Sequence, residues 1–115
     1  MKEYLGIEPY NDTLGVLQDT HWSGAAFGYF PSYTLGAIYA SQFYKTLQEE
    51  MPSLEKEITS GNLAKIREWL NRKIHQKGRL LSVSELVHEV TGENLNPTIF
   101  LDYLKTKYRK IYRLV

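Results

Sequence analysis

The fold class is decided by residues 62–78, NLAKIREWLNRKIHQKG, in which apolar side chains recur every three or four positions. These apolar positions are Leu63, Ile66, Trp69, Leu70 and Ile74. The period places them on one face of an α-helix, where they can pack onto a shared core. Asn62 is suited to cap the start of the helix and Gly78 to end it. We therefore predict a helix over 62–78.

Two further helices are predicted downstream of this stretch. Ser82 and Glu85 match a capping box, in which the hydroxyl accepts from a backbone amide and the carboxylate reaches back to the cap. This helix turns Val87 and Val90 inward and stops at Gly92. Asn96-Pro97 then starts the last helix, because proline is favoured at the first helical position.

Helices are also predicted upstream. A long helix runs from Ser32 or Thr34 to about Glu50, and residues 53–60 form two further turns. Asp12 is placed to cap a short helix over 12–19. No stretch alternates at period two, so the predicted class is all-α: an irregular aromatic N-terminal segment followed by about four to five packed helices.

Composition narrows the function classes. The 115 residues hold 14 Lys and Arg against 13 Asp and Glu, and a net charge of +1 does not favour duplex nucleic acid as a partner. Cysteine is absent, which excludes disulfides and thiolate metal sites. Neither a signal peptide nor a membrane span is recognisable, so we expect a cytoplasmic protein.

The length predicts a single domain or a fragment of one. The chain divides near Pro52 into two parts. The segment 1–51 holds a cleft wall and the long helix, and residues 52–115 form a helical C-terminal subdomain.

The three histidines, His21, His75 and His88, do not form a shared motif. His88-Glu89 begins like the zinc signature His-Glu-x-x-His, but Gly92 stands where the second histidine is needed. No serine lies in a Gly-x-Ser-x-Gly elbow. We predict that this chain alone has no metal ligands and no nucleophile.

Residues 15–36 are different, because polar and aromatic side chains gather there around glycines. They are Gln18, Asp19, His21, Trp22, Tyr29 and Tyr33. One interpretation is a cleft wall, in which tyrosine and histidine donate hydrogen bonds toward a developing negative charge. The other is an aromatic core whose hydroxyls are satisfied internally.

The run 15–22, GVLQDTHW, resembles the Gly-x-x-Gln-Asp-x-His-Trp motif of the carboxypeptidase Taq family of zinc metallocarboxypeptidases. The stretch 27–36 and the segments 91–103 and 107–108 resemble later parts of the same family, so the likeness spans nearly the whole chain. It implies the C-terminal piece of a larger helical metallopeptidase that releases C-terminal amino acids from peptides. In that family the metal-binding helix lies upstream of this motif.

The resemblance also implies roles for single residues. His21 and Tyr33 would hydrogen-bond the substrate carbonyl as it becomes an oxyanion, with Tyr29 as the second candidate tyrosine. Substrate-binding roles fall to Gln18, Asp19 and Trp22. Zinc or cobalt is expected in the full-length enzyme and none in this chain, which we expect to be inactive alone.

The expected partners are a peptide substrate, the N-terminal part of the enzyme and a second copy in a homo-oligomer, without nucleic acid or membrane. The alternative is a stand-alone helical binding protein, because uncovered apolar surface commonly forms interfaces. A basic run at 105–113 raises a third interpretation, a surface for nucleic acid or membrane. A solvated helix face explains that run better.

Overall fold

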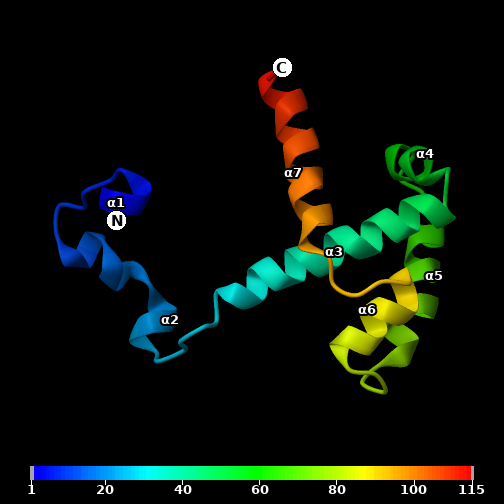
Figure 1. Ribbon diagram of the computed structural model, residues 1–115, viewed down its shortest axis with the longest axis horizontal. Coiled ribbons are helices and arrows are strands. Elements are labelled where there is room, and N and C mark those ends of the chain that lie inside the picture. Colours follow the sequence, from blue (N-terminus) through cyan, green and yellow to red (C-terminus); the bar gives the residue numbers. More distant parts are fainter. Residues whose placement is uncertain (1, 115) are drawn as a thin grey trace. The chain divides into compact units, whose positions relative to one another are not determined.

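The computed structural model describes residues 2–114, apart from the side chain of Trp22, and their regular elements are all helices (Figure 1). The all-α prediction is confirmed. Contacts divide the chain into two compact units, one up to Tyr33 and one from Thr34 onward, and each is described by itself. The predicted organisation as a single domain or fragment stays a prediction. No helix within residues 2–114 is long and apolar enough to cross a membrane.

The first unit contains only short helices: α1 (Lys2–Leu5), α2 (Thr20–Ser23) and the 3-10 turns η1 (Asp12–Leu14) and η2 (Val16–Gln18). The predicted single helix capped by Asp12 is wrong. Asn11 caps η1 instead, since its side chain accepts from the Leu14 backbone N–H at 2.9 Å. Gly15 separates the two turns with a backbone that is neither helical nor extended, and a Cβ there would lie 2.8 Å from the Pro9 ring.

The second unit holds the core. Its first helices are α3 (Pro31–Glu50), α4 (Leu54–Thr59) and α5 (Ala64–Lys73), and α3 starts slightly before the predicted Ser32 or Thr34 because Pro31 takes the first helical position. Four buried apolar side chains from four helices form the centre of this core: Leu47, Leu54, Trp69 and Val90.

Two details of the predicted helix over 62–78 are wrong. Asn62 does not cap it; its amide donates to a Glu57 carboxylate oxygen at 2.7 Å, and α5 begins two residues later, at Ala64, without a side-chain cap. The helix is also interrupted at Ile74, whose φ is −122°, and a 3-10 turn η3 (His75–Lys77) follows. Gly78 ends that turn with a φ of +55°.

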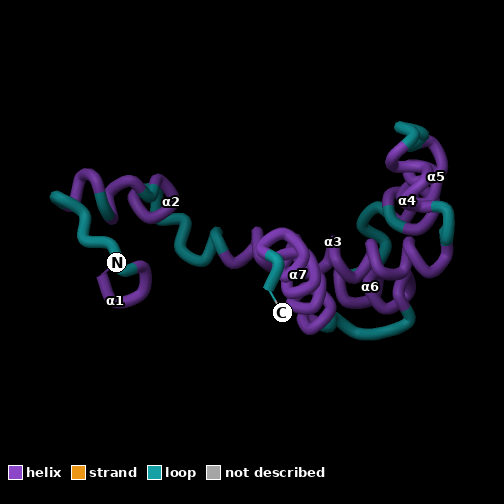
Figure 2. The backbone as a smooth tube through the Cα atoms, turned by 90° about the horizontal axis from the view of Figure 1, so that it is seen from above, coloured by secondary structure: helices purple, strands orange, loops and turns teal. Residues whose placement is uncertain are grey.

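The capping signals downstream are confirmed. Helix α6 (Val83–Thr91) has the capping box of Ser82 and Glu85 and ends at Gly92 with a φ of +77°. Helix α7 (Pro97–Tyr112) is capped by the Asn96 side chain. In Figures 1 and 2, α7 begins beside α3 and extends away from α6.

Gln42 of α3 holds the connection between α6 and α7. Its side chain is buried, its amide donates to the Thr91 hydroxyl at 3.1 Å and to the Asn94 carbonyl at 3.0 Å, and its carbonyl accepts from the Asn96 backbone N–H at 2.9 Å. All polar atoms of this side chain are therefore paired inside the unit.

Candidate functional site

Asp19 and His21 meet because the backbone is irregular between them. Asp19 has an extended backbone, with φ −81° and ψ 103°, at the junction of η2 and α2. One carboxylate oxygen accepts from the His21 backbone N–H at 2.9 Å and lies 3.4 Å from the Nδ1 atom of the same histidine. The aspartate thus holds both the start of α2 and the orientation of the imidazole.

Two aromatic rings contact the imidazole, and a third contacts one of these two. The His21 ring stacks on Tyr29 with centroids 4.5 Å apart and an interplanar angle of 16°, and Phe30 meets it edge-on at 4.7 Å. Tyr33 contacts Tyr29 edge-on at 5.4 Å. We call these four residues the aromatic cluster; all of them lie in the first unit.

The turn at Gly28 brings the tyrosines back toward His21. Gly28 has a φ of +76°, a conformation that glycine adopts without steric cost. The Ala26 backbone N–H donates to the His21 carbonyl at 2.8 Å, which closes the turn against α2. Pro31 then starts α3, whose first turn carries Tyr33.

The two phenols of the cluster influence each other. A hydrogen bond with Tyr29 raises the pKa of Tyr33 above its usual value, with smaller contributions from desolvation and from the charge of Tyr29. A raised pKa keeps the Tyr33 phenol neutral throughout the physiological range, so its O–H remains a hydrogen-bond donor. Both tyrosines are exposed, so a ligand can reach them.

The comparison with known proteins identifies the family. The model of the carboxypeptidase Taq (M32) metallopeptidases matches residues 1–108. The chain belongs to this family.

Relatives of this carboxypeptidase family confirm the assignment. Carboxypeptidase 1 of Bacillus subtilis is 41% identical over 113 residues, which are 98% of this chain and 23% of that protein. Thermostable carboxypeptidase 1 of Thermus thermophilus is 40% identical, over 96% of this chain and 22% of that protein. The structure of Trypanosoma cruzi metallocarboxypeptidase 1 has a TM-score of 0.86 and 45% identity, over 95% of this chain and 22% of that one.

The chain therefore spans less than a quarter of the length of these carboxypeptidases, and it corresponds to their C-terminal part.

The structure brings together four of the six predicted site residues of this family member: Asp19, His21, Tyr29 and Tyr33. Gln18 turns elsewhere, since its amide donates to the Thr13 carbonyl at 2.6 Å and ties η2 to η1. Trp22 lies in α2, and its side chain is outside the described part of the structure.

Phe30 was not predicted as a site residue, although it contacts the imidazole. Phenylalanine has no polar atom that would mark it as a candidate for a hydrogen bond to substrate. Its position between Tyr29 and Pro31 was a usable signal. The turn that brings Tyr29 to His21 also brings the adjacent residue, Phe30, close to the imidazole.

The described residues do not fit a metal ion. Among residues 2–114, no three His, Cys, Asp or Glu side chains gather closely enough to hold one. His75 and His88 are exposed, on η3 and α6 of the second unit. The described side chains therefore do not fit the metal implied by the family name. What the cluster offers chemically is hydrogen-bond donors.

Proposed function

We propose that this chain forms part of the substrate-binding wall of a metal-dependent carboxypeptidase that releases C-terminal amino acids from peptides. The observation that carries the proposal is the aromatic cluster, in which His21 and Tyr33 of the family motif region are joined through Tyr29. The metal, zinc or cobalt, is expected in the part of the enzyme upstream of this chain.

His21 and Tyr33 are the proposed catalytic residues. Each would donate a hydrogen bond to the scissile carbonyl oxygen as that oxygen gains negative charge. A donor aimed at a developing oxyanion contributes roughly 3 to 4 kcal/mol, or about 100- to 1000-fold in rate. Asp19 would hold the imidazole in orientation through Nδ1, and Tyr29 would keep the Tyr33 phenol protonated.

Tyr29 stays the second candidate for the donor tyrosine, because its own hydroxyl is exposed beside that of Tyr33. Gln18, Asp19 and Trp22 stay proposed substrate-binding residues. For Gln18 the bond to Thr13 supports an indirect contribution, in which it fixes the turn that carries Asp19.

The roles can be tested in a fusion protein that joins the upstream part of Bacillus subtilis carboxypeptidase 1 to residues 1–115. We expect His21→Gln and Tyr33→Phe each to lower kcat about 100- to 1000-fold, with a smaller change in KM, because the donors act on the transition state. Tyr10→Phe is the matched control, since Tyr10 is 93% exposed and belongs to no ring contact described above. Unchanged kcat in both site variants would refute the assignment.

The chain alone is expected to be inactive, because its described residues hold no metal site. An assay of the purified chain on a blocked dipeptide, with zinc or cobalt added, tests this expectation. Metal-dependent turnover would contradict it.

A second candidate function is that of a helical binding protein without activity. It is favoured by the many large apolar side chains that the described residues leave exposed, among them Leu14, Phe27 and Ile111. Light scattering after size-exclusion chromatography, with an apolar dye, tests for such an interface: a monomer that binds no dye speaks against an exposed apolar interface.

A further inference from the structure

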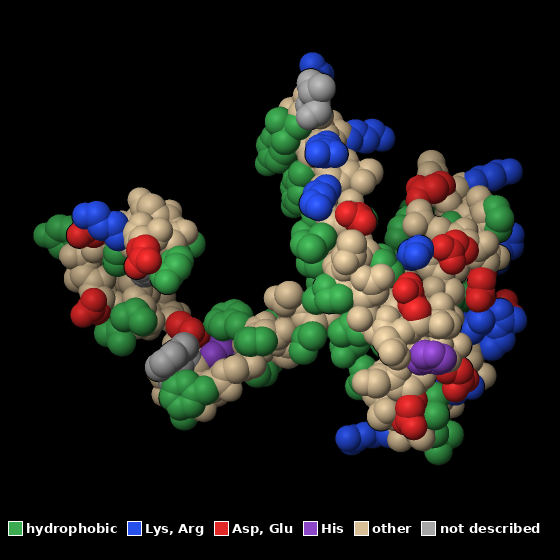
Figure 3. Space-filling view, in the orientation of Figure 1, with side chains coloured by type: hydrophobic (Ala, Val, Ile, Leu, Met, Phe, Trp, Pro, Cys, Tyr) green, Lys and Arg blue, Asp and Glu red, His purple; other side chains and the backbone are tan. Residues whose placement is uncertain are grey.

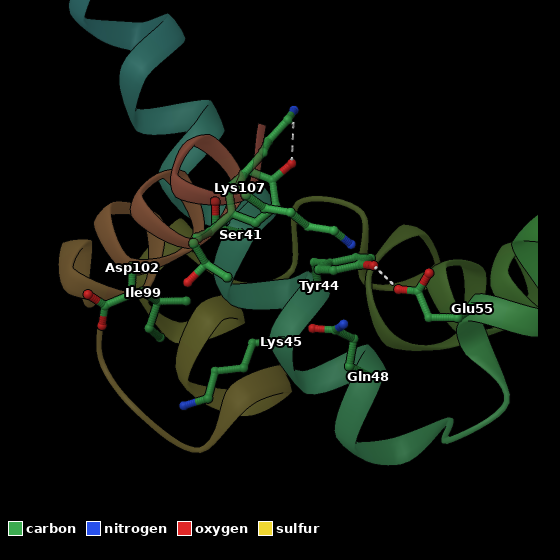
Figure 4. A pocket seen from close by; sticks show the side chains of 11 residues that line it. Ser41, Tyr44, Lys45, Gln48, Glu55, Ile99, Asp102 and Lys107 are labelled. Carbon is green, nitrogen blue, oxygen red and sulfur yellow. Dashed lines mark hydrogen bonds between the residues drawn. The ribbon is translucent and has the colours of Figure 1, made fainter. Parts of the chain in front are cut away.

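Helices α3 and α7 enclose an apolar groove in the second unit. It has a volume of about 490 Å³ and is lined by Ala37, Ala40, Ser41, Tyr44, Phe100 and Tyr103. A more polar groove of about 660 Å³ shares Ser41, Tyr44 and Tyr103 with it and continues along α7 to Lys107 and Lys110 (Figure 4). The two form one surface, which we call the α3–α7 groove.

Small side chains make up most of the α3 side of this groove, which ends at the large ring of Tyr44. Ala37, Ala40, Ser41 and Tyr44 follow one another at steps of three, one and three residues, so they share one face of the helix. A row of small residues lets the backbone of a further helix approach closely, and a ridge of its side chains can enter the space.

The apolar side of α7 continues the groove without a cover. Ile111 lies about three turns after Phe100 on the same face, Tyr108 lies one turn before Ile111, and both Tyr108 and Ile111 are at least 44% exposed. None of the residues of α7 is fully buried. In Figure 3, hydrophobic side chains line one edge of this helix and basic side chains another. An exposed apolar side of this kind commonly packs against a further element.

The exposed area of the whole chain is larger than a second copy alone would cover. The chain exposes 9390 Å², whereas two compact bodies with the lengths of its two units would together expose about 7,700 Å². A second copy bound through a standard interface covers about 800 Å² on each partner. That is about half of the excess. The part of the carboxypeptidase outside this chain is more than three quarters of the length of the Bacillus subtilis relative.

Charge gives the partner a further property. Two of the ion pairs among the described residues involve side chains that line the groove: Lys45 pairs with Glu93 at 3.9 Å, and Asp102 with Lys105 at 4.0 Å. They provide no carboxylate for Lys107, whose ammonium lies 3.4 Å from the Tyr103 hydroxyl and 5.6 Å from the centre of its ring. This cation at the rim of an apolar floor suits a partner with an acidic flank.

We propose that the α3–α7 groove receives an amphipathic helix from the upstream part of the carboxypeptidase. The apolar ridge of that helix lies against Ala40 and Phe100, and an acidic residue on its flank faces Lys107. The inference rests on the proposed function in one respect, since it takes the chain to be part of the longer enzyme. It concerns a surface of the second unit, whereas the proposed site lies in the first.

Hydrogen exchange of residues 97–112 tests the proposal, measured in the free chain and in the Bacillus subtilis fusion protein. We expect these amides to exchange at least about tenfold more slowly in the fusion, because a docked helix opens less often. Ala40→Arg fills the groove and returns the exchange to the rate of the free chain. Ala64→Arg, at an exposed alanine of α5, is the matched control and leaves the protection unchanged.

The variants must fold for this comparison to count. Ala40 is exposed in the chain, so Ala40→Arg should leave the circular dichroism and melting temperature of the free chain unchanged. Lys107→Glu is a second variant, which adds no bulk to the apolar floor. It should lower the protection of α7 in the fusion about two- to tenfold through charge repulsion.

Three outcomes overturn the proposal. They are equal exchange of α7 in the free chain and the folded fusion, an Ala40→Arg variant that behaves like Ala64→Arg, and a free chain that dimerises through α7. The proposed function fails separately. A fusion with protected α7 but no activity refutes that function alone, and an active fusion with unprotected α7 refutes the groove alone.

Discussion

The two units differ in content: the first holds the predicted site residues, and the second holds the long helices and the buried core. The predicted site residues all lie in the first unit, and the last of them, Tyr33, ends it. No described side chain of residues 2–32 is buried, and no helix that ends before Pro31 is longer than four residues. The second unit carries none of those residues, but it has the long helices and the buried cluster around Trp69. The part proposed to bind substrate thus has no core of its own.

This difference bears on how the site is held. Helices of one turn do not persist in water by themselves, so the aromatic cluster and the bond between Asp19 and His21 must supply most of the order in the first unit. Segments that bind ligands commonly belong to the less stable parts of a protein. We therefore expect changes to stability in the second unit and changes to ligand contacts in the first.

The largest effect is expected for Trp69→Ala. Trp69 is 4% exposed, and its truncation should lower the free energy of unfolding of the second unit by about 3 to 5 kcal/mol. The counterpart in the first unit is Phe30→Ala, where loss of an exposed ring that contacts His21 should cost at most about 1.5 kcal/mol. Urea unfolding followed by circular dichroism measures both. Equal losses would mean that the units do not differ in this way.

A smaller effect is expected on the pH dependence of the free energy of unfolding. Hydrogen bonds from Lys73 and from the Trp69 indole lower the pKa of Glu50, and its carboxylate lies 2.8 Å from each donor. Because the folded-state pKa is depressed, this contribution to stability is present above about pH 4.5 and is lost as the pH falls through the lower folded value. Solvent screens the exposed carboxylate, so we expect at most about 1 kcal/mol.

Glu50→Gln separates this contribution from the general effect of acid. Its free energy of unfolding should fall less between pH 6 and about pH 3 than that of the unchanged chain, as measured by urea titrations. Glu49→Gln, at the exposed neighbouring position, is the control and should keep the original pH dependence. If Glu50→Gln kept it as well, the indole and ammonium contacts would not stabilise the folded state.

Local signals predicted those parts of the fold whose cause is local. The capping box of Ser82 and Glu85 and the cap at Asn96 are formed by residues within one turn of each other, so the sequence alone contains them. Asn62 failed as a cap because its amide donates to Glu57 of the preceding helix α4, a contact that the capping signals of the following helix do not contain. The interruption at Ile74 also has no local signal, since nothing in the pattern distinguishes it from a continuing helix face.

The site divides in the same way. Residue types and spacing left a cleft wall and an aromatic core as alternatives, and the family motif directed attention to His21 and Tyr33. What the sequence could not supply was the geometry: the turn at Gly28, and the ring of Phe30 against the imidazole. These depend on how the backbone folds back over eight residues, which no propensity of a single residue predicts.

The smallest expected effect is on the pKa values of two tyrosines, one in each unit, whose upward shifts have different main causes. Both Tyr33 and Tyr44 have a raised pKa, but the hydrogen bond with Tyr29 is the main cause for Tyr33, and desolvation is the main cause for Tyr44. Tyr29→Phe should therefore remove most of the shift of Tyr33. Glu55→Gln should remove only part of that of Tyr44, since burial persists. Titration of tyrosines labelled with ¹³C, followed by NMR, resolves the two phenols.

Mild urea sharpens the same titration. If the first unit is ordered only by its own ring contacts, the pKa of Tyr33 should return to its usual value at a urea concentration that still leaves the pKa of Tyr44 raised. The Tyr10→Phe variant controls for the loss of any exposed phenol in the first unit. A simultaneous return of both values would mean that the units unfold together, so the first unit would draw its order from the core of the second.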